Sequence, residues 1–268
     1  MPFMEWFSSL PTTAAVLLAM LASAAAAVLG LLVVHPIVPH RLRSVHNDVS
    51  GFILSTVGVV YAVLLAFIAV AVWQDFDQAD RLVQTEANLV GDLYRNTAAL
   101  PDPVAQNLRH YLFVYAETVV QDEWPALMAG REEAAAGWQL LDRFHLELVQ
   151  LHTQDLGTAS LHAGMVRTLN ELYDARRGRF HAATADLPSI LWWNLLAGAV
   201  ILMLLTYLFG VPHVVMHAAM VGLLGAAIGL VLALIVLLDH PFQGKNHVSV
   251  EPFNRLVLSV ETMSYPHK

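Results

Sequence analysis

The chain has 268 residues, of which 57% are hydrophobic and only 13% are charged, and its mean hydropathy is +0.56. A soluble domain usually carries roughly a quarter charged residues, so this composition indicates a protein that contacts lipid. The absence of cysteine excludes disulfides, zinc–thiolate sites and a cysteine nucleophile. The net charge of −8 argues against nucleic acid as a partner, because phosphate binding requires a basic surface.

Four segments are long and apolar enough to cross a bilayer. They span about residues 12–34, 51–73, 189–210 and 214–238, and none of them contains Lys, Arg, Asp or Glu. A hydrocarbon core of ~30 Å requires about 20 such residues in a helix. Trp73 ends the second segment and Trp192 with Trp193 opens the third, where interfacial aromatic residues belong. The first ten residues lack the basic part of a signal peptide, so we expect the first span to be retained.

The segment between the second and third spans has the pattern of amphipathic helices. Apolar residues recur at helical spacing, for example at Leu108, Leu112, Tyr115 and Val119. Helix ends are predicted at the turn residues Pro101 to Pro103, Pro125, Gly157 and Pro188. We therefore expect three or four helices packed as a bundle outside the membrane.

The second span is predicted to continue into this outer domain. Nothing interrupts the helical pattern from Trp73 to Leu100, so one helix of about 49 residues is expected. The predicted fold is all-α, divided into residues 1–74 with two spans, a helical extramembrane domain at 75–188, two further spans at 189–238, and a tail at 239–268. Basic residues flank the membrane on both predicted faces, which leaves the orientation of the outer domain open.

Small residues form stripes within three of the spans. In the second span they are Gly51, Ser55, Gly58, Ala62, Ala66 and Ala69, and similar stripes occur in the first and fourth spans. Small residues let helices approach closely in lipid, which favours packing within one subunit. The alternative is that the stripe of the second span lines an axis shared by several identical subunits.

Several short motifs resemble the bacterial bestrophin-like membrane family. They are the run from His46 to Phe52 that leads into Val59 to Phe67, the pairs Glu86-Ala87 and Glu123-Trp124, and the tail segment from Asp239 to Gly244. The resemblance covers about residues 10–260, and its layout is similar to that of bestrophin anion channels. It implies a homo-oligomer, a pentamer by analogy, whose second transmembrane helix lines a pore for permeant ions in the bacterial inner membrane. The acidic calcium site of animal bestrophins has no counterpart in this sequence.

The residues themselves permit a channel but do not require one. The spans contain no acidic or basic residue at the middle of the bilayer, which disfavours ion-coupled transporters. A pore of small and apolar side chains with a hydrophobic constriction is compatible with the sequence. The pore-lining candidates are Gly51, Ser55, Gly58, Ala62, Leu64, Ala66, Phe67 and Ile68. The alternative is a non-conducting membrane scaffold or sensor whose helical domain binds a partner.

Three polar positions near the second span have two interpretations each. Asn47 and Asp48 precede the span, where they either cap the helix or line an ion entrance. Glu86 lies on the extended helix, where it is either a solvated surface residue or, by the family resemblance, an inter-subunit contact.

Histidine is abundant, with 13 copies. His213 and His217 are four residues apart, which is a spacing for metal ligands on a helix, although no carboxylate motif accompanies them. Ordinary interfacial hydrogen bonds are the favoured interpretation, with a metal site or a pH switch as alternatives. No nucleophile elbow, phosphate-binding loop or dinucleotide fingerprint occurs in the sequence, so we predict neither an enzyme nor a cofactor.

Overall fold

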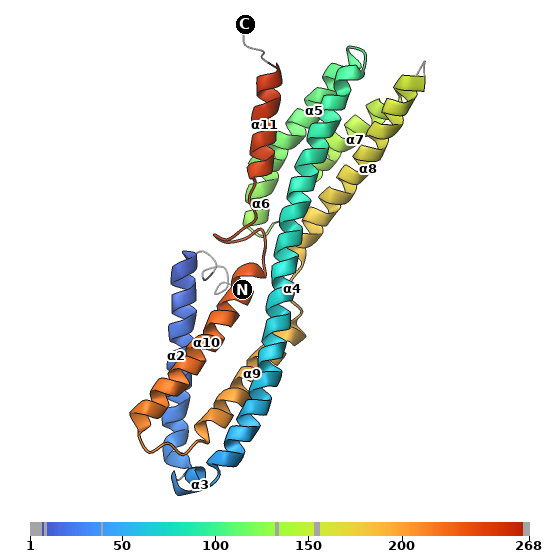
Figure 1. The fold of residues 1–268 in the computed structure, drawn as a ribbon. Coiled ribbons are helices and arrows are strands. Elements are labelled where there is room, and N and C mark those ends of the chain that lie inside the picture. The colour runs from blue at the N-terminus through green and yellow to red at the C-terminus, as the bar shows by residue number, and fades with distance from the viewer. Residues whose placement is uncertain (1–6, 8–9, 39, 132–133, 153–155, 265–268) are drawn as a thin grey trace. The chain divides into compact units, whose positions relative to one another are not determined.

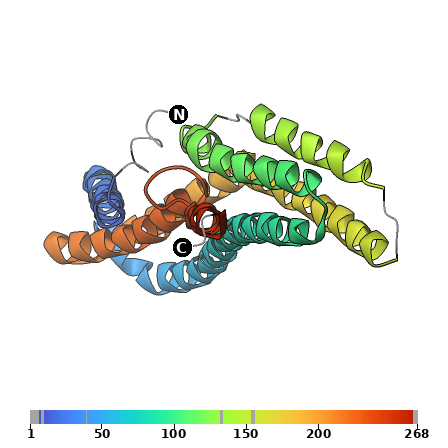
Figure 2. The ribbon, with the colours of Figure 1, turned by 90° about the horizontal axis from the view of Figure 1, so that it is seen from above.

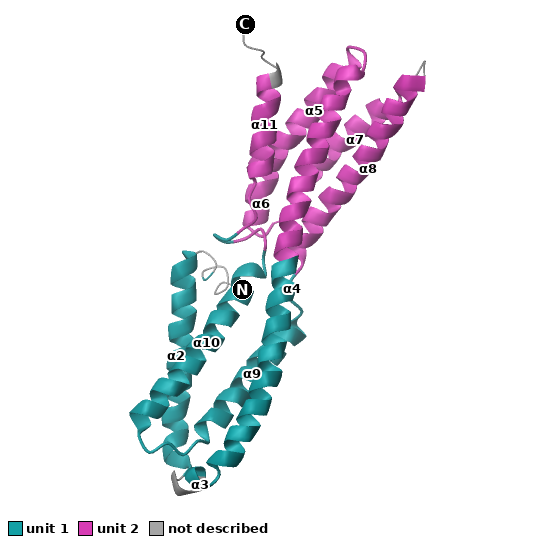
Figure 3. Ribbon diagram, viewed as in Figure 1, with its two compact units in different colours: residues 1–74, 186–240, 244–246 teal, residues 75–185, 241–243, 247–268 magenta. Residues whose placement is uncertain are grey.

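A computed structural model describes residues 7, 10–38, 40–131, 134–152 and 156–264. The described residues form helices and no strands, which confirms the predicted all-α fold. The chain divides into two compact units, shown in Figure 3. Unit 1 comprises residues 1–74, 186–240 and 244–246, and unit 2 comprises residues 75–185, 241–243 and 247–268.

Unit 1 contains the four helices that are long and apolar enough to cross a membrane (Figure 1). They are α2 (Thr12–Ile37), the first part of α4 (Asn47–Asn96), α9 (Ser189–Tyr207) and α10 (Val214–Leu238), with the short α3 (His40–Val45) before α4. The four predicted spans are therefore confirmed as helices. The predicted extension of the second span is also confirmed, because α4 runs without interruption for 50 residues.

The small residues of the first and fourth spans bring α2 and α10 together. A Cβ at Gly225 would lie 2.8 Å from both the Ala27 Cβ and the Ser23 carbonyl oxygen. A Cβ at Gly229 would lie 2.7 Å from the Ala19 carbonyl oxygen. Only glycine permits so close an approach, so these two stripes serve packing within one chain, as the first interpretation predicted.

A second close contact joins α4 to α9. The ring of Tyr61 lies against Gly198, at a position that a Cβ on that residue would occupy. The Tyr61 hydroxyl donates a hydrogen bond of 3.0 Å to the Leu195 carbonyl oxygen. This contact fixes which face of α4 turns toward the rest of unit 1.

Unit 2 is a helical bundle built around the second part of α4. Its other helices are η1 (Thr97–Ala99), α5 (Val104–Thr118), η2 (Val119–Glu123), α6 (Trp124–Met128), α7 (Ala135–Val149), α8 (Leu156–Thr184) and α11 (Glu251–Ser264). Figures 1 and 2 show α7 alongside α5. The residues predicted from helical spacing, Leu108, Leu112, Tyr115 and Val119, are all buried in its core.

One predicted helix end is wrong. At Pro125 the chain does not stop but passes through the π-helical turn η2 into α6. Proline lacks an N–H and crowds the carbonyl four residues before it, and the wider π turn accommodates both. Gly157 is the second residue of α8, so it does mark a helix end, after the break that follows α7. The Pro101–Pro103 segment separates η1 from α5, and Pro188 immediately precedes α9, as predicted.

Candidate functional site

The part of α4 within unit 1 has an inward and an outward face. Tyr61, Leu65, Ile68 and Val72 recur at spacings of four and three and are all buried. Ile68, one of the predicted pore-lining residues, belongs to this inward face with only 5% of its surface exposed. Its side chain is therefore used for packing within its own chain.

The outward face of α4 has no partner among the described residues of its own chain. Phe52, Val59, Val63 and Val70 recur along its centre and are exposed, and Phe67 beside them is 73% exposed. Of the small residues, Ser55, Ala62 and Ala66 recur along one flank of this face and are also exposed. The predicted pore-lining residues Gly51, Gly58 and Leu64 are only partly exposed.

The partly exposed glycines border the contact with α9. A Cβ at Gly58 would lie 3.8 Å from a methyl carbon of Leu202. A Cβ at Gly51 would lie 3.9 Å from the ring of Phe209. The predicted stripe is thus divided, with its glycines turned toward α9 and its Ser55, Ala62 and Ala66 turned outward.

Asn47 fastens the beginning of α4 to the connection between α9 and α10. Its Nδ2 donates to the Gly210 carbonyl oxygen at 3.3 Å, and the Gly210 N–H donates to its Oδ1 at 2.9 Å. The amide of Asn47 therefore bonds another segment and does not act as the predicted helix cap. Asp48 lies exposed in the first turn of α4, where its charge complements the helix dipole.

Gly210 permits this arrangement because α3 passes directly beside it. A Cβ there would lie 2.6 Å from the Ser44 Cα and 2.8 Å from the Arg43 carbonyl carbon. Real Cβ contacts of that length do not occur, so any larger residue would displace α3. The ends of α3 and α9 and the beginning of α4 therefore meet at one place.

The two histidines considered as metal ligands are not brought into a metal centre. His217 is buried, and its Nε2 donates to the Thr206 carbonyl oxygen at 3.1 Å. His213 precedes the first residue of α10. Among the described residues there is no group of three side chains suited to hold a metal ion. His217 has the ordinary hydrogen bond that the favoured interpretation predicted.

Glu86, predicted as a surface or inter-subunit residue, is instead fully buried in unit 2. Its Oε2 accepts a hydrogen bond of 2.6 Å from the Nε of Arg179, and its Oε1 accepts one from the Tyr115 hydroxyl. Because its whole side chain is enclosed by its own chain, the predicted inter-subunit contact is wrong.

Glu86 belongs to a network of two buried carboxylates and two buried arginines. Glu123 accepts from the Nη2 of Arg176 at 2.6 Å and from the Nη2 of Arg179 at 2.7 Å. Arg176 also donates to the Tyr115 hydroxyl at 3.0 Å. The formal charges balance, which is the condition for keeping ionised groups away from water.

The pKa values follow from this arrangement. Burial lowers the pKa of Arg179, but Glu86, Tyr115 and Glu123 together more than offset it, so the net pKa is raised. Burial, reinforced by the charge of Glu86, holds the pKa of Tyr115 well above its usual value. Both arginines therefore stay charged and the tyrosine stays protonated across the physiological range.

Comparison with known proteins identifies a family with this architecture. Residues 21–253 match the model of the bestrophin-like domain. The chain belongs to the bestrophin-like family. No curated protein matches the sequence.

Solved structures show the same fold as this bestrophin-like chain. A bacterial bestrophin homologue from Klebsiella pneumoniae has a TM-score of 0.63 at 18% identity, covering 94% of this chain and 98% of that one. A membrane protein variant has a TM-score of 0.67 at 16% identity, covering 94% of this chain and 99% of that one. A bestrophin-like protein with four apolar helices of this length is an integral membrane protein.

The tail motif of the bestrophin-like chain makes specific contacts within each unit. In unit 1, Asp239 accepts the Leu187 N–H at 2.9 Å, and the Nδ1 of His240 lies 3.2 Å from a carboxylate oxygen of Asp186. In unit 2, the ring of Phe242 packs edge-on against Trp124, with ring centroids 5.5 Å apart. The motif therefore anchors chain segments and does not gather reactive groups.

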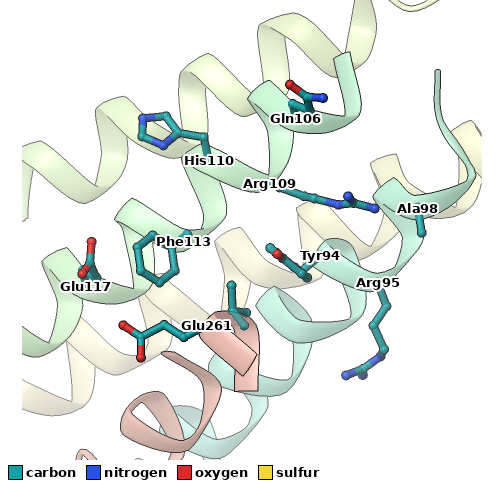
Figure 4. Close-up of a pocket in the computed structure, with 10 residues that line it drawn as sticks. Tyr94, Arg95, Ala98, Gln106, Arg109, His110, Phe113, Glu117 and Glu261 are labelled. Atoms are coloured by element: carbon teal, nitrogen blue, oxygen red, sulfur yellow. The ribbon is translucent and has the colours of Figure 1, made fainter. Parts of the chain in front are cut away.

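Unit 2 also has an open groove of about 940 Å³ (Figure 4). Arg109 extends along it over the ring of Tyr94, at 5.8 Å from the ring centre, and donates to the Thr97 hydroxyl at 2.8 Å. Glu261 of α11 lines another part of the groove. Arg109 is thus already engaged by its own chain.

Proposed function

We propose that this protein is a homo-oligomeric ion channel of the bacterial inner membrane whose pore is lined by α4. The observation that carries the proposal is the outward face of α4, which no described residue of the chain covers over the length of the span. Membership of the bestrophin-like family supports a channel, and the pentameric assembly and the anion selectivity are carried over from bestrophins by resemblance.

Among the described residues, the spans of one chain pack closely against each other at two places. The α2–α10 pair is closed by its glycines, and α4 is closed against α9 by Tyr61 and Gly198. A conducting path therefore requires several copies around a common axis, with the same surface of each copy facing that axis.

We assign the small-residue flank formed by Ser55, Ala62 and Ala66 to the pore wall. Small side chains leave space for ions, and the Ser55 hydroxyl, which donates to the Gly51 carbonyl oxygen at 2.8 Å, adds a polar atom there. Phe67 lies seven residues from Val60, on the opposite flank of the exposed face, so it is not assigned to this wall. Ile68 is left out because it faces inward.

The absence of cysteine allows a direct test with single cysteines introduced into this background. Ala62→Cys and Ser55→Cys should react with a charged, water-soluble methanethiosulfonate in liposomes, and the reaction should reduce ion flux. Val60→Cys is the matched control, because it lies at a similar depth on the opposite flank of the exposed face. Equal reactivity at Val60 and Ala62, or none at either, would contradict the assignment of the pore wall.

A further inference from the structure

Arg43 is a buried cation for which the described residues provide no counter-charge. It lies in α3 with 3% of its surface exposed. Its Nη2 donates to the His35 carbonyl oxygen at 3.5 Å, the upper limit for a hydrogen bond, and its buried Nε has no hydrogen-bond partner. No carboxylate oxygen of the described residues lies within ion-pair distance of it.

The surroundings of Arg43 add positive character. Arg43 and His35 both interact electrostatically with the imidazole of His217. The described acidic residues of unit 1 are Asp48, Asp186 and Asp239. Asp186 and Asp239 lie at the opposite ends of α9 and α10, and Asp48 is exposed in the first turn of α4. The described part of unit 1 therefore supplies no carboxylate partner for this guanidinium.

A buried and unpaired arginine is energetically costly. Removing a charge from water costs several kcal/mol unless an opposite charge and hydrogen bonds replace the water, as they do for Arg176 and Arg179. Unlike lysine, arginine cannot escape this cost by losing its proton. No described residue supplies the missing charge, so a bound ligand is its candidate source.

The geometry of the free donors indicates the kind of ligand. The Nε–H and one Nη2–H of a guanidinium lie on the same edge and point in the same direction. In Arg43 these are the donors that are free or weakly bonded. Two parallel donors match two oxygens of one phosphate or carboxylate group, and they bind it more strongly than a single donor does.

We propose that Arg43 forms an anion site at the α3 end of unit 1 and that its ligand is a phosphate group. That group belongs either to a lipid headgroup or to free phosphate, since both present the same oxygens. The site is held by the Asn47–Gly210 hydrogen bonds and by the close passage of α3 beside Gly210. The inference does not depend on conduction through α4.

The test compares wild type, Arg43→Gln and Arg81→Gln. Arg81 is an exposed arginine of α4 paired with Asp77, so its variant removes the same charge at a surface position. Lipid-depleted protein in detergent is titrated with sodium phosphate at constant ionic strength, and thermal unfolding is followed by tryptophan fluorescence. A ligand bound by the folded state alone raises the unfolding midpoint as its concentration rises. We expect this rise in wild type and Arg81→Gln and its loss in Arg43→Gln.

A second measurement separates the two sources of phosphate. The same proteins are incorporated into nanodiscs of phosphatidylglycerol or phosphatidylcholine in phosphate-free buffer, and retained lipid is counted by native mass spectrometry. Arg43-dependent retention of phosphatidylglycerol identifies a lipid headgroup, and a response to free phosphate alone identifies a soluble anion. The proposal is overturned if Arg43→Gln matches wild type in both measurements.

Two further outcomes are decisive. If Arg43→Gln does not fold, Arg43→Lys replaces it, because lysine keeps the charge but loses the paired donors. Loss of one charge-assisted hydrogen bond should weaken phosphate binding about tenfold. If Arg43→Gln instead disrupts assembly and leaves both binding measurements unchanged, the counter-charge comes from a second copy of the chain and the phosphate site is refuted.

Discussion

Four buried charged side chains balance one another in the core of unit 2. Arg176 and Arg179 are three residues apart on α8, and Glu86 and Glu123 come from α4 and η2. The spacing of the arginines was visible in the sequence. Their pairing with two distant carboxylates was not, because it depends on how α8 crosses the bundle. Only the family motif, which contains Glu86 and Glu123, drew attention to these positions.

We expect Arg179→Met to destabilise unit 2 strongly, because it leaves Glu86 and Glu123 with a single buried cation. Removing one partner of a buried ion pair costs about 3–5 kcal/mol of unfolding free energy. The matched control is Arg167→Met, whose pairing with Glu171 is exposed and is worth at most about 1 kcal/mol. Unfolding of the full chain in mixed detergent micelles measures both. Similar losses in the two variants would show that the network contributes no more than a surface pair.

Asp239 predicts a pH dependence for unit 1. Burial raises its pKa from the usual 3.8, although the Leu187 N–H opposes the shift. The folded state therefore binds its proton more tightly than the unfolded state does, and stability falls as pH rises from about 3.8 through the raised pKa. Asp239→Asn keeps an acceptor for Leu187 and should remove this fall.

The unfolding midpoint of Asp239→Asn, measured between pH 4 and pH 8, checks this prediction. Asp186→Asn is the control, because that carboxylate lies beside His240 but is largely exposed. If Asp239→Asn has the same slope as wild type, burial of the carboxylate does not control the stability of unit 1.

At the scale of elements, hydropathy was sufficient to locate the spans but not to orient them. The four apolar segments form α2, the first part of α4, α9 and α10, because uncharged runs of that length are typical of membrane-spanning helices. Which face of α4 is inward was not predictable, since its small residues occur on two faces. The structure settles this through Tyr61, whose ring occupies the space left by Gly198. The same limitation explains why Ile68 was wrongly grouped with the outward residues Ala62 and Ala66.

The contact between α4 and α9 can be tested with a pair of glycines. Gly198→Ala would place a methyl group against the Tyr61 ring and should cost about 1–3 kcal/mol through overpacking. Gly164→Ala on α8 meets no atom within 4 Å and should stabilise its helix by up to about 1 kcal/mol. Opposite signs in unfolding experiments support the close contact, and a neutral Gly198→Ala contradicts it.

At the scale of the whole molecule, the account depends on assembly. The exposed apolar face of α4 has two possible environments, lipid on all sides or an axis shared with other copies. The bestrophin-like fold favours the second. The family resemblance was detectable from motifs in the sequence, and two of their residues, Asn47 and Phe242, make specific contacts in the structure. In the proposed channel the partner of that face lies in another copy of the chain, so the sequence of one chain could not provide it.

The most direct test of the central claim is ion flux through purified protein in liposomes under an imposed anion gradient, with the oligomer mass determined in parallel. We compare wild type with Ala62→Trp, which fills the proposed pore wall, and Val60→Trp, which adds the same bulk on the opposite flank. The account predicts a ring-sized oligomer that conducts, is blocked by Ala62→Trp and continues to conduct with Val60→Trp. A stable oligomer of wild type that conducts nothing, across pH and divalent ions, would contradict the channel and favour a membrane scaffold.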